Sequence, residues 1–309
     1  MLSIQHMLGM MLVKGGELSS RQIAAVVYPD AIRAYTGPRQ YSHFEKSEDG
    51  TDVSYMRFPE DMHVEKDEIE KSIAAHGHLV PDIRPCAIGE DTDFDAFLAH
   101  NGHLAGEMRE GISIHLQQDI LFDRFIREQI DCSRKYEDIF FFHGQEMNGK
   151  ELRALISEIE QQGIYIMSYI LYQKYHVSTH QGWLEKVVRP ALEAEYPEDL
   201  AKKTFSYMKI NSNVNSRIVV GDWSKLGAGY VPLYDYMKFF AELEKIVPEN
   251  DNQRGLPIRC TKDPTVQEDE RCGTCCIYCE EKHACECRCP KIDKWKTAEE
   301  VYQNCSECA

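Results

Sequence analysis

The chain has 309 residues, of which 43% are hydrophobic, and a formal net charge of −16 at pH 7. This composition excludes wholesale disorder, and the length allows one large core together with a small second module. The acidic balance argues against a protein that binds duplex nucleic acid, because phosphate backbones require Lys and Arg at the contact face. It leaves open a small phosphorylated substrate that metal ions hold in place.

No targeting or membrane segment is expected from the sequence. Residues 1–20 contain neither a basic region nor a small-residue cleavage site, so we predict no signal peptide. No stretch approaches the roughly 18 uninterrupted apolar residues of a transmembrane helix. The twelve cysteines are therefore expected in a reducing, cytoplasmic location, where clustered Cys residues bind metal more often than they form disulfides.

The predicted elements are, in chain order, almost all helices. Apolar spacings of three and four, with turn or capping residues at the ends, predict helices at residues 4–13, 19–27, 91–99, 106–128, 150–160, 163–175, 182–195 and 232–246. Ser19 and Gln22 resemble a capping box at the start of the second helix. The aromatic run at residues 140–142 fits core packing at helical spacing, and the best strand candidate is 217–220. The sequence therefore predicts a mainly α body.

The density of cysteine changes abruptly near residue 250. Ten of the twelve cysteines lie between Cys260 and Cys308, after a polar stretch at residues 247–252 that we interpret as a linker. We therefore predict two domains, a helical metal-binding body at residues 1–250 and a Cys-rich zinc-binding module at residues 251–309.

His115 and Asp119 lie four residues apart in the helix predicted at 106–128, so both side chains project from one face. An imidazole and a carboxylate one turn apart can hold one divalent ion such as Zn²⁺. The same spacing also suits a surface histidine with an acidic partner, which is a common pair on exposed helices.

Four motifs occur in an order that resembles a known family. They are His6, Pro29-Asp30, His43-Phe44 and Gly111-x-x-x-His115-x-x-x-Asp119. Over residues 1–125 they resemble the bacterial zinc-dependent phospholipase C family, whose wider relatives include the S1/P1 nucleases. That family is all-helical and holds a cluster of zinc ions in a cleft.

This resemblance implies a ligand set and a reaction. The implied metal ligands are His6, Asp30, His43, His115 and Asp119, with Asp30 and Asp119 also implied as catalytic carboxylates. About two or three zinc ions would activate a water that attacks a phosphodiester.

Three parts of the family's pattern are altered in this chain. The family uses the amino group of a processed N-terminus as a ligand, and no processing is visible here. In place of the family's next histidine this chain has Asp123, which we predict as a substitute carboxylate ligand. For the family's later His-x-x-x-Glu pair we favour His176 and His180, one helical turn apart, over His143-Gly-Gln-Glu146. The alternative is that His176 and His180 decorate a solvent-exposed face.

The C-terminal segment carries three Cys-x-x-Cys pairs and three cysteines at alternate positions. The predicted ligands are Cys272, Cys275, Cys276, Cys279, Cys285, Cys287, Cys289, Cys305 and Cys308. They can hold roughly one or two tetrahedral zinc ions, which would stabilise a module that has too few apolar residues for a core. Disulfides and an iron–sulfur cluster are the alternatives. Closed thiolate sites leave no position for water, which favours a structural or partner-binding role.

Two functions of different classes are compatible with these patterns. The first is a metal-dependent hydrolase of phosphate esters, acting on a small phosphorylated substrate. The second is a non-catalytic zinc-binding protein that engages a protein partner through the Cys-rich module. The ordered early ligands favour the hydrolase, which we place first, and the incomplete later set favours the binding protein.

Overall fold

The computed structural model describes residues 1–37, 39–45, 55–76, 92–134, 137–179, 182–213 and 233–246. All of them belong to the first of the chain's two units, Met1–Pro248, and the second unit is Glu249–Ala309. The predicted strand at 217–220, His180 and the cysteines between Cys260 and Cys308 lie outside the described residues. What the sequence predicts for them stays a prediction.

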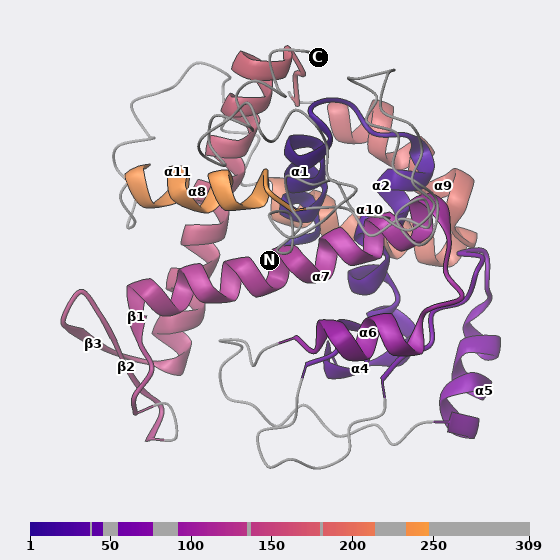
Figure 1. The fold of residues 1–309 in the computed structure, drawn as a ribbon, viewed down its shortest axis with the longest axis horizontal. Coiled ribbons are helices and arrows are strands. Elements are labelled where there is room, and N and C mark those ends of the chain that lie inside the picture. Colours follow the sequence, from indigo (N-terminus) through magenta and orange to yellow (C-terminus); the bar gives the residue numbers. More distant parts are fainter. Residues whose placement is uncertain are drawn as a thin grey trace, which may run out of the picture. The chain divides into compact units, whose positions relative to one another are not determined.

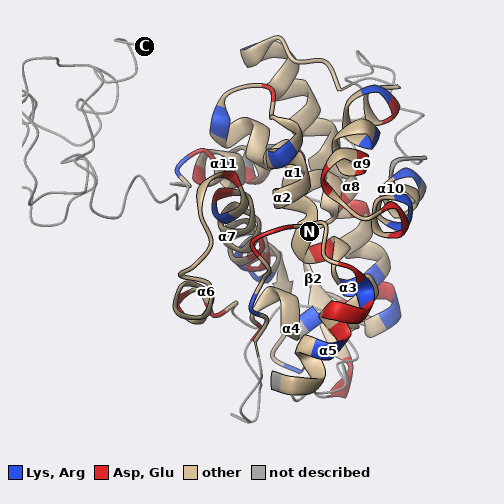
Figure 2. Cartoon of the chain, turned by 90° about the vertical axis from the view of Figure 1, so that its right-hand side faces the viewer, with Lys and Arg blue, Asp and Glu red and all other residues tan. Residues whose placement is uncertain are grey.

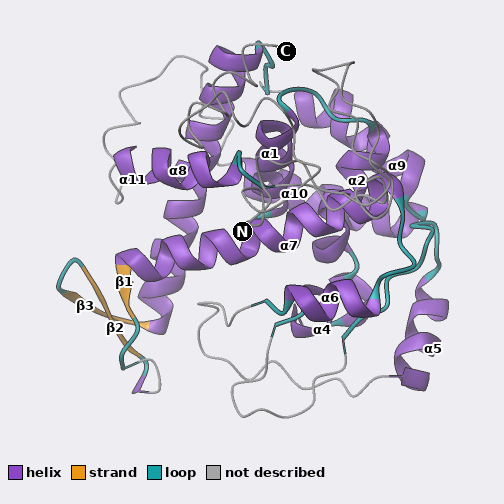
Figure 3. Ribbon diagram, in the orientation of Figure 1, coloured by secondary structure: helices purple, strands orange, loops and turns teal. Residues whose placement is uncertain are grey.

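Most of the described residues are helical, which confirms the mainly α prediction (Figure 3). The α-helices are α1 (Ser3–Lys14), α2 (Ser20–Ala31), α3 (Arg33–Thr36), α4 (Arg39–His43), α5 (Lys66–His76), α6 (Phe94–His100), α7 (Gly106–Gln129), α8 (Gly149–Tyr175), α9 (Arg189–Glu195), α10 (Glu198–Asn213) and α11 (Leu233–Leu243). A π-helix, η2 (Leu184–Val188), precedes α9. β1 (Ile130–Asp131), β2 (Ile139–Phe142) and β3 (Gln145–Asn148) form an antiparallel sheet in that order, directly after α7.

α1 is the central helix because it is apolar around its whole circumference. Residues 3–12 are all buried, and Lys14 is the only Lys, Arg, Asp or Glu in the helix. A helix that is hydrophobic on every side is stable only when it is covered on every side. α1 packs against α2, α7 and α8, which surround it in Figure 1. His6, near the middle of α1, is therefore completely buried.

Two glycines allow helices to approach closely at the positions that matter for this histidine. A Cβ at Gly111 of α7 would lie 2.5 Å from the Cβ of Ala25 and 2.7 Å from the backbone N of Val26, both on α2. A Cβ at Gly9 of α1 would lie 2.8 Å from Oε1 of Gln118 on α7. Glycine is thus required at the first position of the Gly-x-x-x-His motif because it lets α7 press against α2.

Helix ends and lengths agree with the sequence in some places and differ in others. The capping box is confirmed: Ser19 Oγ accepts from the backbone N of Gln22 at 3.1 Å, and Gln22 Oε1 accepts from the backbone N of Ser19 at 3.0 Å. The helices predicted at 150–160 and 163–175 are one continuous helix, α8. Gly163 lies inside this helix and does not end it. A Cβ at Gly163 would lie 3.0 Å from Gln5 Nε2, so the glycine allows α8 to pack closely against α1.

Two further segments depart from the helical prediction. The aromatic run at 140–142 belongs to β2, where Phe140 and Phe142 are buried and the residue between them is half-buried. His143 and Gly144, with φ of 47° and 81°, form the turn to β3, as two-residue hairpins require. The helix predicted at 182–195 is divided into η2 and α9, because Pro190 lacks the N–H that would continue the α-helical hydrogen bonding.

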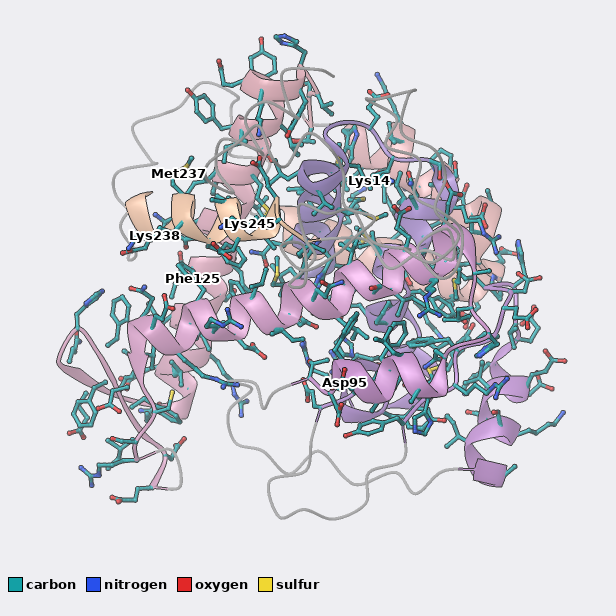
Figure 4. The ribbon with its side chains drawn as sticks, viewed as in Figure 1. Lys14, Asp95, Phe125, Met237, Lys238 and Lys245 are labelled. Carbon is teal, nitrogen blue, oxygen red and sulfur yellow. The ribbon has the colours of Figure 1, made fainter. Side chains whose placement is uncertain are left out.

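Charged side chains lie mainly on the outer helices, and α5 and α10 show this clearly in Figure 2. Met237 and Lys238 of α11, and Lys245 just after its end, are exposed (Figure 4). Phe125 of α7 lies between α7 and α11 (Figure 4), where its ring stacks on Phe239 at 5.0 Å between centroids. None of the helices in the described part of the chain is long and apolar enough to cross a membrane.

Candidate metal centre

His115 and Asp119 lie on the buried face of α7, one turn apart. The side chains are 0% and 1% exposed, and His115 Nε2 lies 3.5 Å from Asp119 Oδ2. The pair is therefore not a surface histidine with an acidic partner, which was the alternative that the spacing left open.

Three further helices bring the other predicted ligands to this pair. His6 of α1 places Nε2 3.3 Å from Asp119 Oδ1, and its ring stacks on that of His115 at 3.6 Å between centroids. His43, the last residue of α4, places Nε2 3.9 Å from Asp119 Oδ2 and 3.2 Å from Oδ1 of Asp30 on α2. The five ligands implied by the family resemblance therefore lie in one cluster, to which α7 and three helices of the first 43 residues contribute.

The Nδ1 atoms of the three histidines have partners outside this cluster of ligands. His115 Nδ1 donates to the backbone carbonyl of Val26 at 2.7 Å. His6 Nδ1 lies 3.1 Å from Gln118 Oε1, and His43 Nδ1 lies 2.9 Å from Ser42 Oγ. A carbonyl can only accept, so Nδ1 of His115 carries the proton and its Nε2 presents a lone pair to the carboxylates. Metal-binding histidines are held in this way.

The electrostatic environment keeps His6 and His43 neutral. Burial, with a further contribution from His115, lowers the pKa of His6 to about 3. Burial and the charge of Arg39 lower the pKa of His43 to about 4. At neutral pH both imidazoles are therefore in the unprotonated form that binds metal.

The same environment keeps the two aspartates ionised. Burial would raise the pKa of Asp119, but the positive charges of Arg39 and the Met1 amino group outweigh it and hold that pKa well below its ordinary value. Burial likewise opposes ionisation of Asp30, and the hydrogen bond with His43 is the largest of the effects that bring its pKa well below the ordinary value. Ser3 Oγ also donates to Asp30 Oδ2 at 2.7 Å. Both carboxylates are therefore available as anionic ligands.

Three charged groups that the sequence analysis did not include also lie in this cluster. Arg39 of α4 places Nη2 2.9 Å from Asp119 Oδ2. The amino group of Met1 lies 3.0 Å from Asp119 Oδ1 and 3.8 Å from Oε1 of Glu160 on α8. Burial opposes the charge on this amino group, but the carboxylate of Asp119 outweighs it and the pKa is raised.

Two of these groups had a signal in the sequence. Glu160 lies four residues from both Ile156 and Ile164, so it interrupts an apolar row of α8 with a carboxylate. Arg39 precedes His43 by four residues, which puts the guanidinium and the imidazole on one side of a helical turn. The position of the Met1 amino group had no local signal, because it depends on how α1 packs against α7 and α8.

Asp123 lies one turn after Asp119 on α7 and is half-buried. Burial, reinforced by the negative charge of Asp119, raises its pKa to about 7. Two groups of possible ligands have all their ligand atoms within 4.8 Å of one another in the described part of the chain. They are His6, Asp30 and His115, and His43, His115 and Asp119. Asp123 belongs to neither group, although its charge interacts with the cluster.

His176, the described member of the later histidine pair, does not lie within a helix. α8 ends at Tyr175, and His176 is its C-cap with φ of 57° and an exposed side chain. Residues 176–179 are not helical, and His180 lies outside the described residues. The other candidate, His143, is exposed in the turn between β2 and β3. Neither His176 nor His143 belongs to a group of candidate ligands.

The side chains that meet here fit a zinc ion. Nε2 of His6 and Nε2 of His115 are buried and have no hydrogen-bond partner among the described residues. A buried polar atom without a partner costs about 1–3 kcal/mol, which coordination to a cation would offset. Three imidazoles and two carboxylates exceed the four ligands of a tetrahedral zinc site. The two groups share His115, whose single Nε2 could bind only one ion, so they would form one centre and not two separate sites.

One side of the centre is partly exposed to solvent. The side chains of Asp30, Glu160 and Arg39 are 12%, 13% and 17% exposed, whereas the three histidines and Asp119 are at most 1% exposed. These three side chains are therefore the ones at the centre that solvent reaches. No protein-family model, curated protein or solved structure is significantly similar to this chain.

Proposed function

We propose that this protein is a metal-dependent hydrolase of phosphate esters, related to the zinc-dependent phospholipases C. The observation that carries the proposal is the convergence of three buried imidazole Nε2 atoms and two buried carboxylates from α1, α2, α4 and α7. Two of the three Nδ1 atoms face an acceptor, Val26 O or Gln118 Oε1, so those rings are oriented for coordination.

His6, Asp30, His43, His115 and Asp119 would hold the metal. A bound divalent ion supplies an acidified water and neutralises the charge of a phosphate, which is the chemistry that phosphate-ester hydrolysis requires. Asp30 is hydrogen-bonded by Ser3 and lies against His43, so its carboxylate is held in one orientation at the exposed side. Asp123, whose pKa is near neutrality, is suited to transfer a proton at the pH of the cell or to add a carboxylate ligand.

One part of the family pattern that the sequence lacks has an alternative in the structure. Glu160 is a partly buried carboxylic acid on α8, and we take it in place of the later pair that we assigned to His176 and His180. The Met1 amino group lies against Asp119 as a cation, so we do not count it among the ligands. Glu160 favours the hydrolase over a degenerate scaffold.

The metal content of the full-length chain tests this proposal. His115→Ala should bind at least one zinc ion fewer per chain than the wild type, measured by elemental mass spectrometry after purification without chelator. His143→Ala, which removes an exposed histidine, should bind the same amount as the wild type. Equal zinc content in the wild type and His115→Ala would contradict a metal centre in the helical body, whatever the Cys-rich segment binds.

Activity is the second test. The zinc-loaded wild type should hydrolyse a member of a panel of phospholipid headgroup analogues, cyclic nucleotides, single-stranded oligonucleotides and simple aryl phosphate esters. If zinc is bound at His115 and no ester of the panel is hydrolysed, the non-catalytic zinc-binding function replaces the hydrolase.

A further inference from the structure

Arg39 is a cation placed among the carboxylates of the candidate metal centre. Its Nη2 lies 2.9 Å from Asp119 Oδ2, and its Nε lies 2.5 Å from Oε1 of Glu45. Glu45 is itself buried and accepts a hydrogen bond from Nε, which fixes that end of the guanidinium. The contact with Asp119 is an ion pair, and a guanidinium carries five N–H donors in all.

We propose that Arg39 is the residue that binds the phosphate group of the substrate, an inference that rests on the proposed function. α4 carries both this guanidinium and the ligand His43, four residues apart, so the two groups face the same space. A planar guanidinium suits phosphate better than an ammonium does, because it can donate two parallel hydrogen bonds to two phosphate oxygens.

Exposure distinguishes Arg39 from the other cation that contacts Asp119. The Met1 amino group is 0% exposed and lies between Asp119 and Glu160, whereas the Arg39 side chain is 17% exposed. Among the described residues, these two are the Lys, Arg or terminal amino groups within 4.0 Å of Asp119. Of these two cations, Arg39 is therefore the one that a dissolved anion can contact.

Charge explains why an arginine is useful at this position. Arg39 interacts electrostatically with four carboxylates, those of Asp119, Glu45, Asp123 and Asp30. Without Arg39, its surroundings would therefore be strongly acidic. The chain as a whole carries −16. A phosphate ester would be repelled by these groups unless fixed positive charge offset them.

Asp119 links metal binding to phosphate binding by Arg39. The atom that is ion-paired with Arg39, Oδ2, also lies 3.5 Å from His115 Nε2 and 3.9 Å from His43 Nε2, and it is thus a candidate ligand atom. Coordination of a divalent ion by this carboxylate weakens its attraction for the guanidinium. Nη2 of Arg39 then becomes available to a phosphate oxygen beside the ion, while Glu45 keeps Nε in place.

Binding of inorganic phosphate to the zinc-loaded, full-length protein tests the proposal. Isothermal titration calorimetry should show that Arg39→Gln weakens phosphate binding by about 10- to 100-fold, as expected for the loss of a charge-assisted hydrogen bond. Arg39→Lys, which keeps the charge and loses the planar fork, should weaken it less. Arg21→Lys is the matched control, because Arg21 pairs with Glu195 at a surface site and should leave phosphate affinity unchanged.

Zinc content, measured on every variant, separates the two proposals. If His115→Ala retains as much zinc as the wild type, the metal centre itself is wrong. If Arg39→Lys and Arg39→Gln keep their zinc and bind phosphate as tightly as the wild type, the role of Arg39 is wrong. Loss of zinc in both Arg39 variants would make Arg39 a structural counter-ion of Asp119, and absence of phosphate binding to the zinc-loaded wild type would also overturn the proposal.

Discussion

Nδ1 of His115 on α7 donates to the backbone carbonyl of Val26 on α2 at 2.7 Å, across 89 positions of the sequence. This bond exists because Gly111, one turn earlier on α7, has no Cβ to hold the helices apart. The helix contact thus determines which nitrogen of His115 faces Asp119. The close packing of α7 on α2 thus orients a candidate metal ligand.

Gly111→Ala should lower the free energy of unfolding by about 1–3 kcal/mol, because its Cβ would overlap the backbone of α2 and force the helices apart. Gly16→Ala is the control, since a Cβ at Gly16 has nothing within 4 Å and should change stability by no more than about 0.5 kcal/mol. Urea unfolding followed by circular dichroism measures both. Equal stabilities of the two variants would refute the role assigned to Gly111.

Gln118→Leu should lower zinc affinity by about 10- to 100-fold while leaving the helical content unchanged, because His6 loses the acceptor that orients its ring. Gln117→Leu is the matched control: that side chain bonds to Ser113 of its own helix. Competition with a chelator of known affinity measures how tightly each variant binds zinc. The zinc ion of interest is the one that the wild type binds and His115→Ala does not. A Gln118→Leu protein that holds this zinc as tightly as Gln117→Leu would contradict the assigned orientation of His6.

Asp123→Asn should stabilise the metal-free protein increasingly as pH rises from about 4 to about 7, and by a constant amount above. The pKa of Asp123 is raised from 3.8 to about 7 on folding, so the folded wild type binds a proton that the unfolded chain has released, and stability falls over this window. We expect a difference on the order of 1–3 kcal/mol at its plateau, reduced from the full shift because the side chain is half-buried.

Two histidines act in the opposite direction and cancel in this comparison. The lowered pKa values of His6 and His43 give stability that is present above pH 6.5 and lost as pH falls to about 4 and below, in both proteins. Unfolding of the wild type and Asp123→Asn in chelator, at several pH values, isolates Asp123. A difference that does not depend on pH would show that this carboxyl titrates normally.

Asp119→Asn should reduce hydrolysis of any phosphate ester by about 100-fold or more, a loss comparable with that of one group that stabilises a transition state. The amide cannot offer two anionic oxygens to an ion, to Arg39 and to the Met1 amino group. Cys275→Ser, in the Cys-rich segment, should leave turnover per folded molecule unchanged. Steady-state rates of the wild type, Asp119→Asn and Cys275→Ser measure these effects. Full activity of Asp119→Asn would show that this carboxylate is not part of the active site.

Several features of this protein were determined by local sequence alone. The capping box at Ser19, the long helix α7 and the spacing of His115 and Asp119 all depend on residues within a few positions of one another, where helical geometry fixes the outcome. His6, Asp30 and His43 were predicted as further ligands because their motifs occur in the same order as in a known family.

Local reasoning was wrong where a residue served a distant partner. The sequence predicts a separate helix that begins at Gly163, but this glycine allows α8 to pack on Gln5, and α8 is one helix from Gly149 to Tyr175. The helix ends at Tyr175 as predicted, and its C-cap, His176, has a left-handed backbone conformation and not a helical one.

Only the tertiary structure decided which charges share the centre. Met1 and Asp119 are 118 positions apart, and Glu160 joins them from a further helix. Whether a buried imidazole faces a carboxylate, a carbonyl or an apolar side chain depends on how whole helices pack, and side-chain volume and close contact govern that packing over distances no local pattern spans. The burial that shifts the pKa values of His6, Asp119 and Asp123 has the same origin, because desolvation is a property of the assembled core and not of the residue or its neighbours in the chain.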